Sequence, residues 1–113
     1  MYEIRILMTN EPRSYRETIA LALKMKYPHA EVATAEPGAS DAEVARLGPQ
    51  LVICSRVTDL IKMMVPTWVE LYSEYGQNSI VSFEGRCSTV ADIDLEDLIY
   101  LVDRTRTFSL DTA

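Results

Sequence analysis

Apolar positions in the first half of the chain switch between the two-residue period of strands and the longer period of helices. The segments 3–8, 30–34 and 49–56 are predicted to be strands. Between them, apolar side chains recur at helical spacing over residues 12–26 and again after residue 40. Strands that alternate with helices pair in parallel through right-handed crossovers, so the pattern predicts a β-α-β-α-β unit with sheet order 2-1-3.

Local signals mark the ends of these helices. Asn10 is expected to cap the first helix, with Pro12 in its first turn, and Pro28 is expected to stop it. Ser40 and Glu43 have the spacing of a capping box for the second helix. The stripe of the first helix that is predicted to face the core is formed by Tyr15, Ile19, Ala22, Leu23 and Lys26.

The second half is predicted to leave the parallel pattern. Only the eleven residues 56–66 precede the next strand, at 67–72, whereas a parallel crossover takes roughly a dozen residues or more. We therefore expect the strand at 67–72 to be antiparallel or irregular. A hairpin formed by 79–83 and 86–91 follows, and Asp94 caps a final helix.

These elements predict one α/β domain over residues 1–113. The fold class is three-layered, with a flavodoxin-like start, an antiparallel hairpin in the second half and a C-terminal helix. The hairpin is expected to turn at Glu84 and Gly85. Serines and apolar residues are mixed on both faces of the hairpin, so the pattern leaves its buried face open.

Charge and composition narrow the classes of function. The net charge is −6; residues 1–56 carry seven basic and seven acidic side chains, and residues 57–113 carry four and ten. Nucleic-acid binding relies on basic clusters, so no nucleic-acid partner is predicted. No apolar run reaches the roughly 20 residues that cross a membrane, and the strand-like N-terminus does not resemble a signal peptide. Cys54 and Cys87 match no metal or disulfide spacing, which favours a reduced, cytoplasmic protein.

Candidate chemistry gathers where the first and third predicted strands end. Asn10, Glu11, Ser55 and Arg56 should meet at the C-terminal edge of the parallel strands, where such folds bind ligands. One interpretation is a degenerate polar pocket, in which Arg56 supplies the charge for a small anion. The other is structural: Asn10 caps the helix and Ser55 satisfies backbone groups.

Other side chains also allow two interpretations. Cys54 could be a reactive thiol or a structural one, and its apolar surroundings favour the structural role. The aromatic residues Trp68, Tyr72 and Tyr75 could belong to the core or form a partner contact. Because an antiparallel segment leaves a sheet edge unpaired, we predict the partner contact here, with another protein or a second copy of the chain.

Three segments of the first half resemble the receiver domain of two-component response regulators. Residues 4–16 resemble its first strand, acidic pair and first helix, and residues 31–36 resemble its second strand. Residues 48–55 resemble the strand that ends in its phosphoacceptor aspartate. The likeness covers about residues 3–56 and implies a regulatory or signalling function.

The chain departs from that family at the residues that carry its chemistry. Asn10 and Glu11 stand where the family has its acidic pair, and Ser55 stands where it has the phosphoacceptor aspartate. The family's later serine or threonine and its last-strand lysine have no counterpart. No catalytic residue, metal site or cofactor is therefore predicted. The hypothesis is a non-phosphorylatable regulatory module that acts by protein contact; the alternatives are a domain that binds a small anionic ligand and an enzyme of unrecognised type.

Overall fold

The computed structural model describes residues 4–71 and 78–112, with the side chains of the last helix described as far as residue 107. The strands are β1 (Ile4–Met8), β2 (Ala30–Thr34), β3 (Leu51–Cys54), β4 (Thr67–Glu70), β5 (Asn78–Phe83) and β6 (Arg86–Ala91). The helices are α1 (Arg13–Lys26), the 3-10 turn η1 (Pro37–Ala39), α2 (Ser40–Leu47), α3 (Asp59–Met64) and α4 (Leu95–Thr112).

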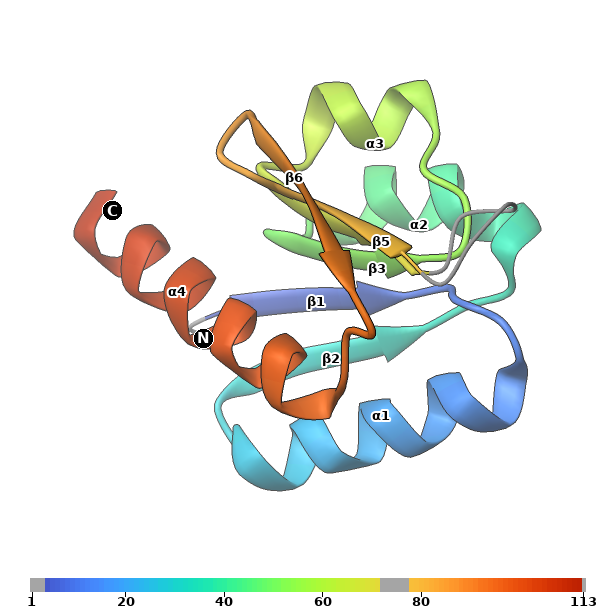
Figure 1. Cartoon of the computed structure of the whole chain (residues 1–113), viewed down its shortest axis with the longest axis horizontal. Coiled ribbons are helices and arrows are strands. Elements are labelled where there is room, and N and C mark those ends of the chain that lie inside the picture. Colours follow the sequence, from blue (N-terminus) through green and yellow to red (C-terminus); the bar gives the residue numbers. More distant parts are fainter. Residues whose placement is uncertain (1–3, 72–77, 113) are drawn as a thin grey trace.

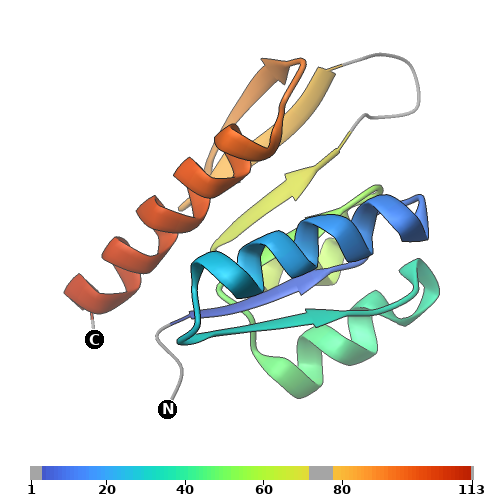
Figure 2. The ribbon, with the colours of Figure 1, turned by 90° about the horizontal axis from the view of Figure 1, so that it is seen from below.

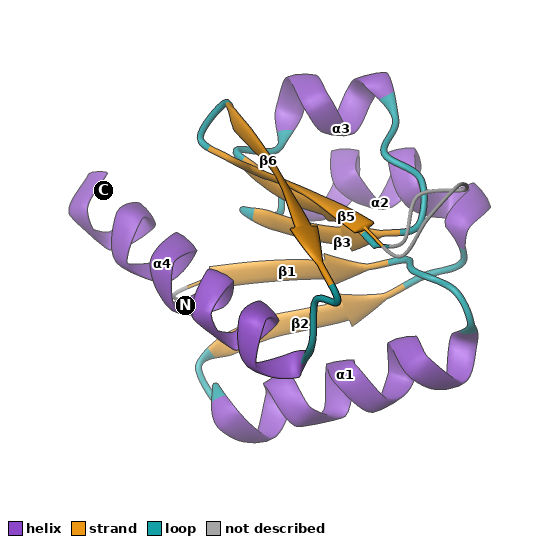
Figure 3. Cartoon of the chain, in the orientation of Figure 1, coloured by secondary structure: helices purple, strands orange, loops and turns teal. Residues whose placement is uncertain are grey.

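All six strands form one mixed sheet in the order β2-β1-β3-β4-β5-β6 (Figures 1 and 3). The first four strands are parallel, and β5 and β6 are antiparallel to their neighbours. The parallel part has the 2-1-3-4 order of flavodoxin-like folds. The predicted fold class is confirmed, including the antiparallel hairpin and the C-terminal helix.

Helices cover both faces of the sheet and make the three layers (Figure 2). Helices α1 and α4 pack on one face, in a core that includes Ile6, Ile53 and Leu98. Helices α2 and α3 pack on the other, in a core that includes Val52 and Ile61. Successive residues of β3 thus enter opposite cores, because side chains alternate across a strand. Among the described residues, no helix is long and apolar enough to span a membrane.

Strand β4 corrects one prediction. It pairs in parallel with β3, and the reversal of direction comes one strand later, between β4 and β5. Because β3 ends at Cys54, the crossover has the twelve residues 55–66, about the minimum length for a parallel connection. The six-residue helix α3 is enough to bridge the gap, with Thr58 as its N-cap and Ile61 buried against the sheet.

The helix caps are partly as predicted. Asp94 and Asp97 bond reciprocally at the start of α4: each side chain accepts the backbone N–H of the other residue, at 3.0 and 3.1 Å. The predicted caps of α1 and α2 are wrong. The N-cap positions are Pro12 and Ala39, neither with a side-chain cap bond. Ser40 lies inside α2, where its hydroxyl donates to a carbonyl of η1.

The hairpin turns at Glu84 and Gly85 as predicted, and both have positive φ angles, of 51° and 84°. Two such residues form the tight turn whose twist matches paired strands. Val81 and Val90 pack against the core beneath α1 and α4, whereas Ile80 packs toward the opposite core. Both faces of β5 therefore contribute to packing.

Candidate functional site

The C-terminal ends of β1, β2 and β3 open on one edge of the sheet, at the right of Figure 1. We call this the polar edge and define it by Asn10, Glu11, Arg16, Glu36 and Ser55. The start of α1 and the loops after β1, β2 and β3 supply these residues. The sequence predicted Asn10, Glu11 and Ser55 at this place, and the structure brings them there.

Ser55 is already engaged with the backbone. Its Oγ accepts a hydrogen bond from the N–H of Glu11, at 2.8 Å. Just before this bond along both segments, the N–H of Thr9 donates to the carbonyl of Ile53, also at 2.8 Å. The loop after β1 is thus fastened to the end of β3 by a side chain as well as by the strand ladder. For Ser55, this is the structural role that the sequence left as one of two alternatives.

Asn10 is fully buried and does not cap α1. Its exposed fraction is 0%, and neither its Oδ1 nor its Nδ2 has a hydrogen-bond partner in the described part of the chain. Its carbonyl oxygen is approached by Nη1 of Arg16, at 3.5 Å. A buried amide without partners costs free energy, so this position calls for a physical explanation.

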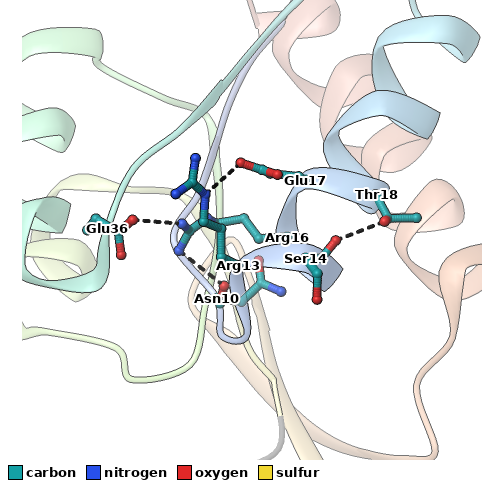
Figure 4. A network of polar contacts seen from close by, with 7 residues as sticks. All are labelled: Asn10, Arg13, Ser14, Arg16, Glu17, Thr18 and Glu36. Atoms are coloured by element: carbon teal, nitrogen blue, oxygen red, sulfur yellow. Dashed lines mark hydrogen bonds and ion pairs between the residues drawn. The ribbon is translucent and has the colours of Figure 1, made fainter.

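Arg16 is a residue that the sequence analysis missed. Its side chain comes from the first turn of α1, is only 3% exposed and lies between Asn10 and Glu36 (Figure 4). Its Nη2 donates to Oε1 of Glu36 at 3.2 Å, and its Nε has no partner among the described residues. Because the Glu36 side chain is 67% exposed, a buried cation is balanced mainly by one solvated carboxylate.

The burial of Arg16 is consistent with the spacing of the buried positions along α1. The buried face of α1 consists of Arg16, Ile19, Ala20 and Leu23. These positions follow the i, i+3, i+4, i+7 rule without exception. The predicted stripe shared only Ile19 and Leu23 with this face, because it ran through Tyr15, Ala22 and Lys26 in place of Arg16 and Ala20.

Further side-chain bonds brace the connection that follows β3. Oε2 of Glu70, at the end of β4, accepts the N–H of Val57 at 2.8 Å. The hydroxyl of Thr58 donates to Oδ1 of Asp41, on α2, at 2.6 Å. Arg56 lies between these braces and is exposed. The connection is therefore tied to β1, β4 and α2 at once.

Cys54 has the environment of a structural thiol. Its exposed fraction is 1%, and its Sγ donates to the carbonyl of Val69 at 3.4 Å. Burial, with a smaller effect from the charge of Glu70, raises the pKa of the thiol to about 12. The thiolate form that nucleophilic chemistry needs is therefore suppressed at neutral pH.

Of the three predicted partner aromatics, the structure describes one. Trp68 is 6% exposed and belongs to the core beneath α2 and α3, which also contains Val65 and Ile61. Its ring is a core side chain and forms almost no surface. Tyr72 and Tyr75 lie outside the described residues.

Comparisons with known proteins identify no relative of the chain. No family model, no curated protein and no solved structure matches it. Within residues 4–71 and 78–112, no three His, Cys, Asp or Glu side chains lie close enough together to hold a metal ion.

Proposed function

We propose that this chain is a non-phosphorylatable, receiver-like regulatory module that acts in the cytoplasm by contact with another protein chain. The hydrogen bond from the Glu11 N–H to Ser55 Oγ is the single observation that carries the proposal. It gives the hydroxyl at the end of β3 a bracing role in the place where a receiver domain has its phosphoacceptor. The flavodoxin-like strand order is compatible with the proposal but does not establish it.

Within the described part of the chain, the hydrogen bond to the Ser55 oxygen comes from a backbone N–H and not from a base. A serine becomes a useful nucleophile when an adjacent base takes its proton. The N–H of Glu11 donates to the Ser55 oxygen and uses one of its lone pairs. The only histidine of the chain, His29, precedes β2 and lies at the opposite edge of the sheet.

A phosphodonor test addresses this proposal directly. The protein is incubated with acetyl phosphate and Mg²⁺, and its intact mass is measured beside that of a Ser55→Ala variant. Both proteins should keep their original mass. A phosphoryl group that appears on the native chain and is missing from the variant would overturn the proposal.

The buried Arg16 and Asn10 favour a second candidate, a site for a small anion. The Arg16 guanidinium, whose Nε has no partner among the described residues, lies beside a buried amide and provides donors suited to a carboxylate or a phosphate. This differs from the predicted site, in which Arg56 carried the charge. Thermal unfolding in the presence of phosphate or citrate tests it, because a ligand that binds only the folded state raises the melting temperature. An equal rise for native protein and for Asn10→Ala would count against the site.

A further inference from the structure

Strand β6 is the most exposed strand of the sheet. Its first four residues and its last are exposed, and only Val90 is half-buried. It pairs with β5 on one side, and no described strand pairs with its outer side. β6 contains no proline and no lysine, and its only charge is Arg86 at its first position. Natural proteins usually protect such an edge with those residues, a bulge or a cover.

The geometry of the hairpin fixes which backbone groups point outward. Across a two-residue turn, the flanking residues Phe83 and Arg86 form a hydrogen-bonded pair. Bonded and non-bonded pairs then alternate along the ladder. The N–H and C=O groups of Cys87, Thr89 and Ala91 therefore point away from β5 and can accept a further strand.

Charge is distributed unequally along this strand. Beside its first residue, Arg86, the guanidinium of Arg104 stacks over the ring of Phe83 at 4.5 Å. Beyond its last residue lie exposed acidic side chains, two before α4 and two in its first turn: Asp92, Asp94, Glu96 and Asp97. A second copy in antiparallel orientation would place the basic end of each strand against the acidic end of the other.

We propose that the outer edge of β6 binds a second copy of this chain, by antiparallel β6–β6 pairing about a twofold axis at Thr89. A twofold axis perpendicular to the sheet places one residue of β6 opposite its own copy, in either a bonded or a non-bonded pair. Centring the axis on Thr89 brings all three outward-facing residues of β6 into bonded pairs, whereas centring it on any other residue of the strand leaves at least one of them unpaired. The assembly closes as a dimer with a continuous twelve-stranded sheet, twice the six strands of one chain.

This register also matches the side chains. Arg86 lies opposite Asp92 of the second copy, and this pair of opposite charges occurs twice in the dimer. Thr89 lies opposite its own copy, and cross-strand threonine pairs stabilise sheets. The three outward residues form three bonded pairs, each with two N–H···O=C bonds, or about six in all.

A charge exchange tests the interface. The native chain should sediment as a dimer at micromolar concentration. Arg86→Glu and Asp92→Lys should each weaken the dimer roughly tenfold to a hundredfold, since each sets two like-charge pairs across the interface. The double variant should recover the native association, because it restores both pairs in reverse. A strictly monomeric native chain, or a double variant no better than the single ones, would refute the proposal.

A cross-link tests the register independently of affinity. Cys87 lies opposite Ala91 of the second copy, and Cα atoms of a bonded pair are about 5.5 Å apart, within disulfide range. Mild oxidation of Ala91→Cys should therefore give a covalent dimer through Cys87. The matched control, Cys87→Ser with Ala91→Cys, should stay uncross-linked. A covalent dimer of this control, or none in either protein, would contradict the register.

This inference deepens the proposed function, since its regulatory meaning rests on a module that acts by protein contact. The two can fail separately. Loss of the dimer would leave the mass result on Ser55 untouched. A phosphorylated Ser55 would remove the proposed function and leave the β6 interface intact.

Discussion

The parallel strands and the hairpin differ in how far their residues and backbone polar groups are exposed. In β1 and β3 nearly every residue is buried, and the loops at their C-terminal ends are fastened by side chains such as Ser55. In β6 most residues are exposed and the outer backbone groups meet no described strand. At the edge where parallel sheets bind ligands, Ser55 is occupied by an internal bond, whereas the backbone groups of Cys87, Thr89 and Ala91 point outward from the hairpin. The proposed β6 interface rests on this contrast between the two regions.

The largest expected effect on the free energy of unfolding comes from replacing valine by alanine, and the same substitution is compared in the two regions. Val52 in β3 is fully buried, whereas Val90 in β6 is only partly buried. Val52→Ala should lower the free energy of unfolding by about 2 to 3 kcal/mol, through lost burial and a residual cavity. Val90→Ala should cost about 1 kcal/mol. Urea denaturation measures both; equal losses would mean that the hairpin is packed as tightly as the parallel strands.

The next effect depends on pH and distinguishes the two cysteines. Cys54 is buried and Cys87 is exposed. The folded-state pKa of Cys54, about 12, lies above the roughly 8.5 of an unfolded thiol. The folded state then holds a proton that the unfolded state releases, so stability is complete below pH 8.5 and falls as the pH rises toward 12.

Between pH 8.5 and 10 this loss should amount to about 2 kcal/mol in the native protein, and it should be absent from Cys54→Ala. Urea denaturation at a series of pH values provides the measurement. Cys87→Ser is the matched control and should keep the native slope. A native protein with constant stability over that interval would show that the Cys54 thiol is not shielded as the structure has it.

A smaller effect is expected where Ser55 braces the polar edge. Ser55→Ala removes the acceptor of the Glu11 N–H and should lower the free energy of unfolding by about 1 kcal/mol. Ser88→Ala, on the exposed hairpin strand, should change it by less than about 0.5 kcal/mol. Both are measured by urea denaturation at protein concentrations low enough to avoid association. If the two variants proved equally stable, the hydroxyl of Ser55 would not be a brace.

The sequence predicted the architecture well because hydrophobic period and turn residues are local properties. The order 2-1-3 of the first three strands, the turn at Glu84 and Gly85 and the cap at Asp94 were predicted from such patterns and are confirmed. The direction of β4 was not predicted correctly. That direction depends on whether the six-residue helix α3 is long enough to connect two parallel strands, and a local sequence pattern does not contain that distance.

The candidate site was predicted only in part. Position along the strands was enough to bring Ser55 to the edge beside Glu11. Arg16 was missed because the burial of a charged side chain is decided by tertiary packing, against its intrinsic preference for water. Asn10 was assigned as a cap because its residue type favours that role, yet the chain turns so that its amide points inward.

The smallest expected change in the free energy of unfolding comes from removing the negative charge that faces Arg16. Glu36→Gln keeps a hydrogen-bond acceptor but removes the negative charge that faces the buried guanidinium, so it should cost up to about 1 kcal/mol. Glu17→Gln is the control, because Glu17 pairs with the exposed Arg13 at 2.8 Å and solvent screens that pair. Chemical denaturation at low and high salt should show a loss for Glu36→Gln that persists at high salt, because burial limits screening on the arginine side. A loss that vanished with salt would place Arg16 in contact with solvent, and the polar edge would then be as open as the hairpin.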